Sequence, residues 1–396
     1  MEYMSARDAA RKWNVSARLI QRYCAEGRIK GARKSGTVWE IPSDAAKPKD
    51  PRKKEGAVET IYRNPSFPNL MPLMNTAFLP GHCLEFIHGM KNGPRKDIAF
   101  AEYHYFSGHP KEASQEAEGY LTCRDAEVRL SACLIYAYSN LSLGNIQRAR
   151  YALEEIKNTL KADTERSSHV RSIEGFISAA AAVLLHLPLP EELPDAKEFM
   201  PSLPLGLRAF ALYVQAHYLY LQKKYEHSIG IIESALTMGA EQYPISAIYL
   251  HLAAVMDHMS LKQADRAEEH LLAAWRLARP DDLIEGFGEH HGLLGGMLEA
   301  VIKQKWPEDF KRIIAITYEF SSGWRKIHNQ ETGHDVADDL TTTEFAAAML
   351  AARNWTNPEI AEHMNISVNT VKHHNSQAMK KLNVGNRKDL KKYMLE

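Results

Sequence analysis

The stretch from Leu340 to Leu390 reads LTTTEFAAAMLAARNWTNPEIAEHMNISVNTVKHHNSQAMKKLNVGNRKDL, and it offers four positions at which a helix can begin. A Ser, Thr or Asn before a helix accepts a hydrogen bond from a backbone N–H of the first turn, and a Glu three residues later can return the bond. The four starts are Thr341 with Glu344, Thr356 with Glu359, Ser367, and Asn386 with Asp389. Four short helices are therefore expected.

The apolar residues of this stretch recur at helical spacing, which predicts one buried face on each of the first three helices. They are Phe345, Met349 and Leu350, then Ile360, Ala361 and Met364, then Val371, Ala378 and Leu382. Only Asn365 and Ile366 connect the second and third helices. Two short helices joined by a tight turn, the second rich in polar side chains, are typical of a helix-turn-helix that binds DNA.

The stretch resembles the DNA-binding domain of the LuxR family. The matching residues are Leu340, Thr341, Glu344, Leu350, Thr356, Asn357, Glu359, Ile360, Ala361, Ile366, Ser367, Thr370, Val371, Lys372, His374, Lys381, Leu382, Val384, Asn386 and Arg387. Asn375 and Ala378 depart from the family, which usually has larger apolar residues there, and Asn354 replaces a turn glycine. Asparagine tolerates the left-handed backbone region, so that last change is mild.

The resemblance implies that the helix from Ser367 to Leu382 enters the major groove of double-stranded DNA. It implies base contacts for Lys372, His373 and Ser376, and phosphate contacts for Thr370, Lys380, Lys381 and Arg387. We expect a homodimer on DNA, because one short helix reads few base pairs, and the resemblance makes Lys388 to Leu395 a candidate dimer surface. The alternative interpretation is a helical bundle that does not bind DNA.

Residues 3–42 predict a second small module, with the sequence YMSARDAARKWNVSARLIQRYCAEGRIKGARKSGTVWEIP. Ser5 with Asp8 predicts one helix start and Ser16 a second, and Gly27 ends the second helix. A turn at Lys34-Ser35-Gly36 then predicts a hairpin. Two helices followed by a hairpin are the layout of a small winged helix, in which we expect Trp13 and Trp39 to be core residues.

This module resembles the MerR- and excisionase-like DNA-binding domains. The resemblance is carried by Ser5, Ala9, Ala10, Val15, Ser16, Arg18, Ile20, Gly27, Arg28, Ile29, Gly36, Trp39, Ile41 and Pro42. It implies that the groove face of the second helix is formed by Ala17, Arg18, Gln21 and Arg22, and that Arg33 and Lys34 lie on the wing near phosphates. A structural or protein-binding winged helix is the alternative.

Between the two modules the pattern is almost entirely helical and loosely repetitive. Large residues, a turn glycine and a small residue that opens the next helix recur near 36 residues apart, as in Phe106, Gly108 and Ala113 and then Leu141, Gly144 and Ala149. Further units run through Tyr218, Leu221, Tyr225, Ser228 and Ala235 and through His258, Ala267, Leu271 and Ala274. The pattern resembles tetratricopeptide repeats. A proline-rich segment from Pro188 to Pro204 interrupts it, and a non-repeat helical bundle is the alternative.

The sequence therefore predicts a mainly α protein with five segments. They are a winged helix-turn-helix at 1–46, a linker at 47–75, a tetratricopeptide-like helical sensor or docking domain at 76–328, a linker at 329–339, and a LuxR-type four-helix domain at 340–396. Charge follows this division: residues 1–54 carry 14 Lys and Arg against 6 Asp and Glu, and residues 340–396 carry 8 against 5. Basic ends suit a phosphate backbone and the acidic middle does not.

Composition narrows the function further. No run of about 18 apolar residues and no apolar leader is present, so we expect a cytoplasmic protein without membrane contact. Four cysteines without a CxxC pair are expected to be reduced thiols, and neither His82-Cys83 with His88 nor His373-His374 has the spacing of a metal site. The GxxxxGK, GxSxG and HExxH motifs are absent, so no enzyme, metal or cofactor is expected.

The favoured hypothesis is a sequence-specific transcriptional regulator whose helical repeats sense a small molecule or a protein. The alternative is a helical-repeat adaptor that binds a protein partner without sequence-specific DNA binding. Tyr103, Tyr105, Tyr136, Tyr138, Tyr213, Tyr218 and Tyr220 could line a ligand site, although packing between repeats is the expected role of most.

Overall fold

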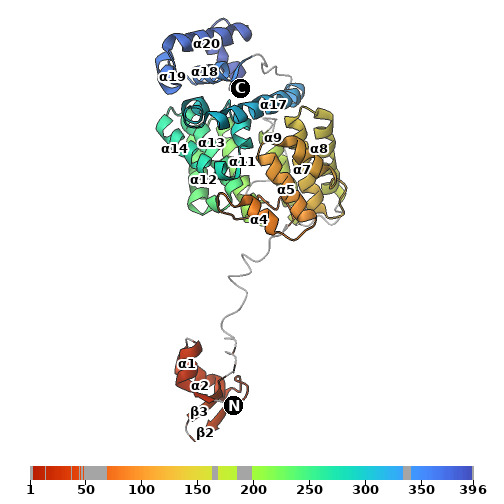
Figure 1. Cartoon of the computed structure of the whole chain (residues 1–396), viewed down its shortest axis with the longest axis vertical. Coiled ribbons are helices and arrows are strands. Elements are labelled where there is room, and N and C mark those ends of the chain that lie inside the picture. Colours follow the sequence, from red (N-terminus) through yellow and green to blue (C-terminus); the bar gives the residue numbers. More distant parts are fainter. Residues whose placement is uncertain are drawn as a thin grey trace. The chain divides into compact units, whose positions relative to one another are not determined.

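The computed structural model is mainly helical and divides into two compact units, residues 1–64 and 65–396 (Figure 1). It describes residues 3–13, 15–36, 38–43, 45, 48, 69–162, 168–184, 199–332 and 340–394. Most of the predicted first linker and of the second, and the prolines Pro188, Pro190 and Pro194, lie outside the described residues. No helix among those described is both long enough and apolar enough to cross a bilayer.

Unit 1 contains two helices and a small antiparallel sheet. Its elements are β1 (Tyr3–Ser5), α1 (Ala6–Trp13), α2 (Ala17–Ala25), β2 (Arg33–Ser35) and β3 (Val38–Pro42). The sheet order is β1-β3-β2, with Lys34 opposite Trp39 in the predicted hairpin and Met4 opposite Ile41. The sequence prediction missed β1, because three residues before a helix cap are too short to show the alternation of a strand. Trp13 is buried in the core, and Trp39 packs against it half-buried.

The helical domain of unit 2 extends from α4 to α17. Its elements are α4 (Cys83–Gly89), α5 (Pro94–Phe106), α6 (Pro110–Glu118), α7 (Ala126–Ser142), α8 (Ile146–Ala162), α9 (Ser168–Leu184), η1 (Met200–Ser202), α11 (Leu205–Leu221), α12 (Tyr225–Thr237), η2 (Ala240–Gln242), α13 (Pro244–Ser260), α14 (Ala264–Ala278), η3 (Arg279–Asp281), α15 (Glu285–Glu289), η4 (Leu298–Ile302), α16 (Lys303–Lys305) and α17 (Pro307–Thr332).

The hairpins α5–α6, α7–α8, α11–α12 and α13–α14 share one type of turn. Each has a residue with positive φ after its first helix: Gly108 (78°), Gly144 (70°), Lys223 (62°) and Lys262 (61°). The N–H of that residue bonds back to the carbonyl three residues earlier, which satisfies a helix end. A small, buried residue then opens each second helix: Ala113, Ala149, Ser228 and Ala267. In the last two turns a lysine occupies the left-handed position. The same turn therefore forms there although the sequence has no glycine to indicate it.

The segment before α4 is part of the core, although the sequence assigned residues 47–75 to a linker. Leu70, Leu73 and Met74 are buried. The carboxylate of Glu102 accepts hydrogen bonds from the N–H groups of Leu73 (2.7 Å) and Met74 (3.0 Å). Burial raises the pKa of Glu102 to about 8, against the effect of these two bonds. Pro72, one of the prolines that suggested a linker, is buried within this packed stretch, so its presence in the sequence did not distinguish the stretch from a linker.

The C-terminal helices pack on the helical domain within unit 2. They are α18 (Thr342–Ala352), α19 (Asn357–His363), α20 (Val368–Lys381), η5 (Arg387–Leu390) and α21 (Lys391–Met394). Every residue from Ala346 to Ala352 is at most 3% exposed, and the apolar core of these helices is continuous with that of the helical domain. A surface helix buries one stripe, so α18 is covered on more than one side.

Candidate DNA-binding surface and the adjoining cavity

The helix starts of the C-terminal module have the predicted caps. Thr341 Oγ1 accepts from the Glu344 N–H (3.2 Å), and the Glu344 carboxylate accepts from the Thr341 N–H (2.8 Å). Thr356 and Glu359 form the same reciprocal pair, and Ser367 Oγ accepts from the Thr370 N–H at 3.0 Å. These bonds fix where α18, α19 and α20 begin.

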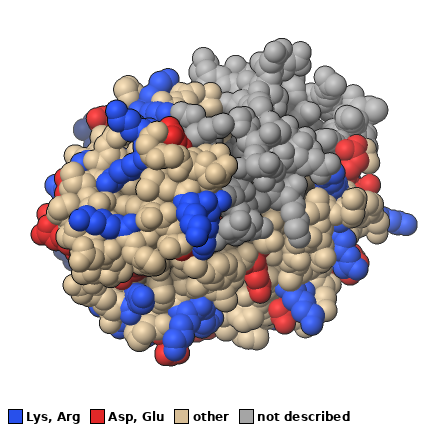
Figure 2. Space-filling model, turned by 90° about the horizontal axis from the view of Figure 1, so that it is seen from above, with Lys and Arg blue, Asp and Glu red and all other residues tan. Residues whose placement is uncertain are grey.

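Helix α20 has one buried and one exposed face. Val371, Asn375 and Ala378 face the core. The opposite face exposes Lys372, His373, Ser376 and Lys380, at a spacing that places them on one side of the helix. No Asp or Glu occurs between Ser367 and Leu382. Figure 2 looks down on the end of unit 2 where α20 lies and shows separate Lys and Arg side chains spread over it. The exposed face of α20 can therefore approach a polyanion without repulsion from carboxylates on the same helix.

Three of the predicted phosphate-contacting residues have partners inside the module. Thr370 Oγ1 is 2.8 Å from Ser367 Oγ at the start of α20. Lys381 donates to Glu344 at 2.7 Å. Arg387 donates to the Trp355 carbonyl and, at 2.9 Å, to Asn357 Oδ1, and burial lowers its pKa. Lys381 therefore joins the end of α20 to the start of α18, and Arg387 joins η5 to the α18–α19 turn.

Two of the three departures from the LuxR pattern, Asn375 and Asn354, have local explanations. Asn375 is 5% exposed, and its Nδ2 donates to Asn357 Oδ1 (3.2 Å), so it joins α20 to α19 by a polar contact instead of an apolar one. Asn354 has φ of 64°, the left-handed conformation for which glycine is usual. The module thus keeps its geometry with different side chains.

In unit 1 the residues proposed for the groove and wing lie on one helix and one hairpin. Arg18, Gln21 and Arg22 are exposed on α2, and Ala17 is half-buried at its start. Lys34 is exposed on β2. Its neighbour Arg33 donates to Glu40 at 2.8 Å and lies over the Tyr3 ring, so its position is set within the hairpin.

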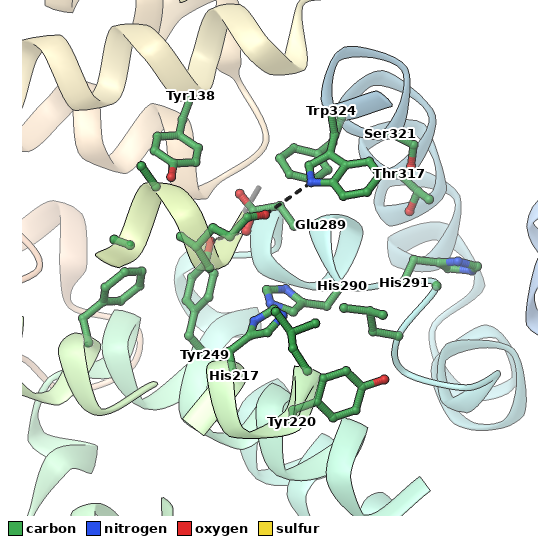
Figure 3. Close-up of a pocket in the computed structure, with 18 of the residues that line it drawn as sticks. Tyr138, His217, Tyr220, Tyr249, Glu289, His290, His291, Thr317, Ser321 and Trp324 are labelled. Atoms are coloured by element: carbon green, nitrogen blue, oxygen red, sulfur yellow. Dashed lines mark hydrogen bonds between the residues drawn. The ribbon is translucent and has the colours of Figure 1, made fainter. Parts of the chain in front are cut away.

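A cavity of about 600 Å³ lies where the helical domain meets the C-terminal module (Figure 3). Its wall is mostly apolar and aromatic, with residues from α5, α7, α9, α11, α13 and α17. The C-terminal module contributes Leu340, Thr342, Phe345, Met349 and Tyr393 to the same wall. Of the tyrosines that the sequence singled out, Tyr105, Tyr138 and Tyr220 line this cavity.

The C-terminal module packs against the loop HHGLLGG at residues 290–296. A Cβ on Gly292 would lie 2.4 Å from Phe345 Cε1, and one on Gly295 would lie 2.6 Å from Arg353 Nη1. Gly295 and Gly296 also have positive φ, 60° and 77°. The loop therefore needs glycine both for its backbone and for the close approach of α18. Sequence reasoning passed over this loop, although three glycines within five residues were a visible signal.

Arg353, at the end of α18, is buried in the helical domain. Its Nη2 donates to Tyr220 Oη (2.7 Å) and to the Leu293 carbonyl (2.8 Å), and the residue is 7% exposed. Asp257 of α13 is fully buried, and burial raises its pKa to about 8 against the attraction of Arg353. A buried guanidinium with few partners is costly, so this contact adds little net stability to the packing of α18.

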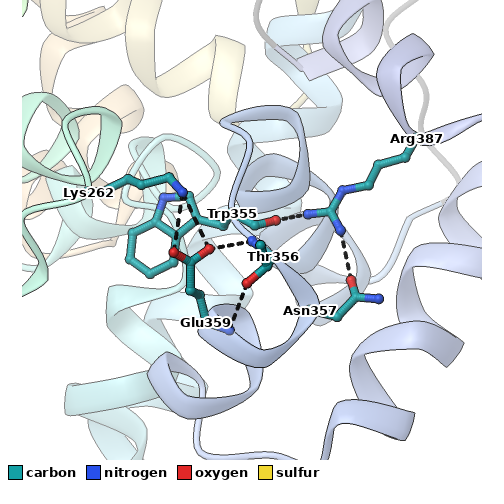
Figure 4. Close-up of polar contacts among 6 residues, drawn as sticks. All are labelled: Lys262, Trp355, Thr356, Asn357, Glu359 and Arg387. Carbon is teal, nitrogen blue, oxygen red and sulfur yellow. Dashed lines mark hydrogen bonds and ion pairs between the residues drawn. The ribbon is translucent and has the colours of Figure 1, made fainter.

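A second polar contact lies at the rim of the same interface (Figure 4). Lys262, in the α13–α14 turn, is 3.3 Å from the Glu359 carboxylate and lies over the Trp355 ring at 5.9 Å. The Thr356 backbone N–H and hydroxyl, together with Lys262, lower the pKa of Glu359. Exposed ion pairs add little stability, so the apolar burial of α18 and not this ion pair holds the two parts together.

Comparison with known families identifies a relationship for the C-terminal module. The family described as "Bacterial regulatory proteins, luxR family" matches residues 338–394. A search of curated proteins and a search of solved structures found no significant match. The C-terminal module is thus a LuxR-type helix-turn-helix, which supports a DNA-binding transcriptional regulator.

Proposed function

We propose that this protein is a sequence-specific transcriptional regulator that reads double-stranded DNA with α20 and is controlled through its helical domain. The observation that carries the proposal is the exposed face of α20, which presents Lys372, His373, Ser376 and Lys380 on a capped helix-turn-helix of the LuxR type. Lysine and serine on such a face can donate to base edges in the major groove. The effector would be a small molecule or a partner that acts at the helical domain.

The packing of α18 supports control by the helical domain. The α20 face stays exposed while α18 is buried, so the contact between the domain and the module does not cover the reading surface. We propose that it acts instead on pairing. Tyr393 of α21 lines the cavity, so part of the candidate dimer surface at residues 388–395 faces the helical domain.

We also propose a fold type for the helical domain and for unit 1. The four helical hairpins with a common turn and a small opening residue favour a tetratricopeptide-like solenoid over an unrelated bundle. The two helices and the hairpin of unit 1, with Arg18, Gln21 and Lys34 exposed, favour a MerR- or excisionase-like winged helix that binds DNA.

The proposal is tested by the affinity of Lys372→Ala for a selected DNA site, measured by fluorescence anisotropy over a range of salt concentrations. Loss of a base contact should cost about 1–3 kcal/mol on the cognate site and little on unrelated DNA. Lys111→Ala, on the exposed face of α6, removes the same charge from the helical domain and is the matched control. A uniform loss on all DNA would make Lys372 a phosphate contact, and equal affinity for both variants would contradict the proposed reading helix.

A further inference from the structure

The cavity between the helical domain and the C-terminal module is large enough for a small molecule. Its volume, about 600 Å³, lies within the range of about 300–1,000 Å³ that ligand sites have. Such sites combine an apolar wall with a few convergent polar groups. The side chains on the wall therefore indicate the chemistry of what could bind.

A carboxylate opens into this cavity. Glu289 accepts hydrogen bonds from the hydroxyls of Tyr105 and, at 2.7 Å, of Tyr249. No Lys, Arg or His in the part of the chain that the structure describes forms an ion pair with it. Glu285, one helical turn earlier, is a second buried carboxylate, and burial raises the pKa of both groups. This end of the cavity thus has an excess of negative charge whenever Glu289 is ionised.

Aromatic rings surround the carboxylate. The Tyr105 and Tyr138 ring centroids are 6.4 Å apart, those of Tyr213 and Tyr249 are 5.2 Å apart, and those of Phe210 and Tyr249 are 5.4 Å apart. Figure 3 shows Glu289 between Tyr138 and Tyr249 on one side and Trp324 on the other. The faces of such rings attract cations, and a carboxylate among them adds a counter-charge.

The histidines and the lysine of the wall do not give this site a net positive charge. His291 Nε2 is 2.8 Å from the Glu299 carboxylate, which balances any charge on the ring. His290 Nδ1 donates to the Gly286 carbonyl at 2.8 Å, and its Nε2 lies 2.7 Å from the Tyr213 hydroxyl oxygen. Burial lowers the pKa of His290 to about 4. His217 continues the chain through Tyr213 at 3.2 Å. Lys223 is exposed on the α11–α12 turn and forms no ion pair with Glu289.

We propose that this cavity binds a small molecule with a protonated amine or quaternary ammonium group on an apolar body, and that Glu289 is its counter-charge. Binding itself does not depend on the proposed function, but its effect on DNA binding does. That effect is expected because the wall includes Phe345, Met349 and Tyr393 of the C-terminal module. A ligand that needs both parts of the wall stabilises the docked arrangement. Occupancy therefore opposes release of the module and pairing on DNA.

The test is calorimetric binding to the full chain at neutral pH, with four probes that share one alkyl chain. Octylammonium and octyltrimethylammonium carry a cation, octanol is neutral and octanoate is an anion, each used below its micelle concentration. We expect the cations to bind best. Glu289→Gln keeps the size of the side chain. It should weaken the affinity for the cations by about 30-fold, because a buried charge pair loses one partner, and leave the affinity for octanol unchanged.

Two control variants complete the experiment. Glu308→Gln removes the same charge from the exposed start of α17 and should bind all probes as the wild type does. Ala181→Phe adds a ring to the cavity wall and should weaken every probe, which places binding in the cavity. Thermal unfolding of each variant without probe shows that it is folded.

The proposal is overturned if no cation binds, if octanol or octanoate binds as well as the cations, or if Glu289→Gln leaves the preference for cations unchanged. Binding is measured without DNA, so this result does not depend on whether Lys372 reads a base. If the chain binds the cations but no DNA, the proposed ligand site stands and the proposed function as a transcriptional regulator is refuted.

Discussion

Replacing Gly292 with alanine is expected to loosen the contact between the C-terminal module and the helical domain. The added methyl group would lie 2.4 Å from Phe345 Cε1 and 3.1 Å from Cδ1 and Cζ. Carbon atoms in contact stay about 3.5–4.0 Å apart, so the ring or the loop has to move by roughly 1 Å. Gly292 does not need positive φ, so the effect comes from the steric overlap and not from the backbone.

The size of the effect follows from packing. Inserting a methylene-sized group into a close-packed site typically costs about 1–3 kcal/mol. Phe345 belongs to α18, so this cost falls on the docked arrangement and lowers the docked to undocked ratio by about 5- to 150-fold. Lys372 and the rest of the exposed α20 face are unaffected.

Hydrogen exchange measured by mass spectrometry tests this prediction. The amides of residues 290–297, covered by the module, should exchange faster in Gly292→Ala by about the factor by which docking weakens, if undocking is the opening that exposes them. Gly230→Ala is the matched control, because nothing lies within 4 Å of its added Cβ in α12. The same replacement there should stabilise the helix by up to about 1 kcal/mol and leave exchange at 290–297 unchanged. Equal exchange in Gly292→Ala and wild type would refute the reasoning.

Three further predictions concern the rest of the chain. Arg18→Ala should weaken DNA binding by the full chain by about 1–3 kcal/mol if its side chain reaches a base, and unchanged affinity for every DNA tested would leave unit 1 a structural or protein-binding module. Glu102→Gln loses an acceptor for one of two backbone N–H groups and should lower the free energy of unfolding by about 1–3 kcal/mol in urea titrations; an unchanged midpoint would show that residues 70–75 pack without it. His290 has a pKa of about 4 in the fold and about 6.5 when unfolded, so the unfolded chain binds more protons between these values. Its contribution to stability is full above about pH 6.5 and is lost as the pH falls toward 4, and His290→Gln should flatten that dependence; identical pH profiles would contradict a neutral buried ring.

Local signals made the C-terminal module predictable. Thr341, Thr356 and Ser367 begin helices because hydroxyl caps act within four residues, and such short-range chemistry is visible in a sequence. The buried face of α20 followed from spacing alone. The small β1 strand and the packed stretch at residues 69–75 were not predicted, because tertiary pairing and not local pattern places them in a sheet and a core.

The contact between the two parts of unit 2 was beyond sequence reasoning. The apolar run AAAMLAA at 346–352 exceeds what one buried face needs, and it now has an explanation in the helical domain that covers its other side. Arg353 was not singled out, because an arginine at a helix end usually faces water. Glu289 was missed for a similar reason: a lone glutamate has no motif, and only the fold places it among the tyrosines.

The most direct test of the account is selection of genomic DNA fragments in vitro with the full chain and with Lys372→Ala. We predict that the wild type enriches a discrete site that Lys372→Ala loses, while the control Lys111→Ala retains it. If a folded wild-type chain enriches no site, with or without the cationic probes, or if Lys372→Ala enriches the same site equally well, then α20 does not read DNA and the account is wrong.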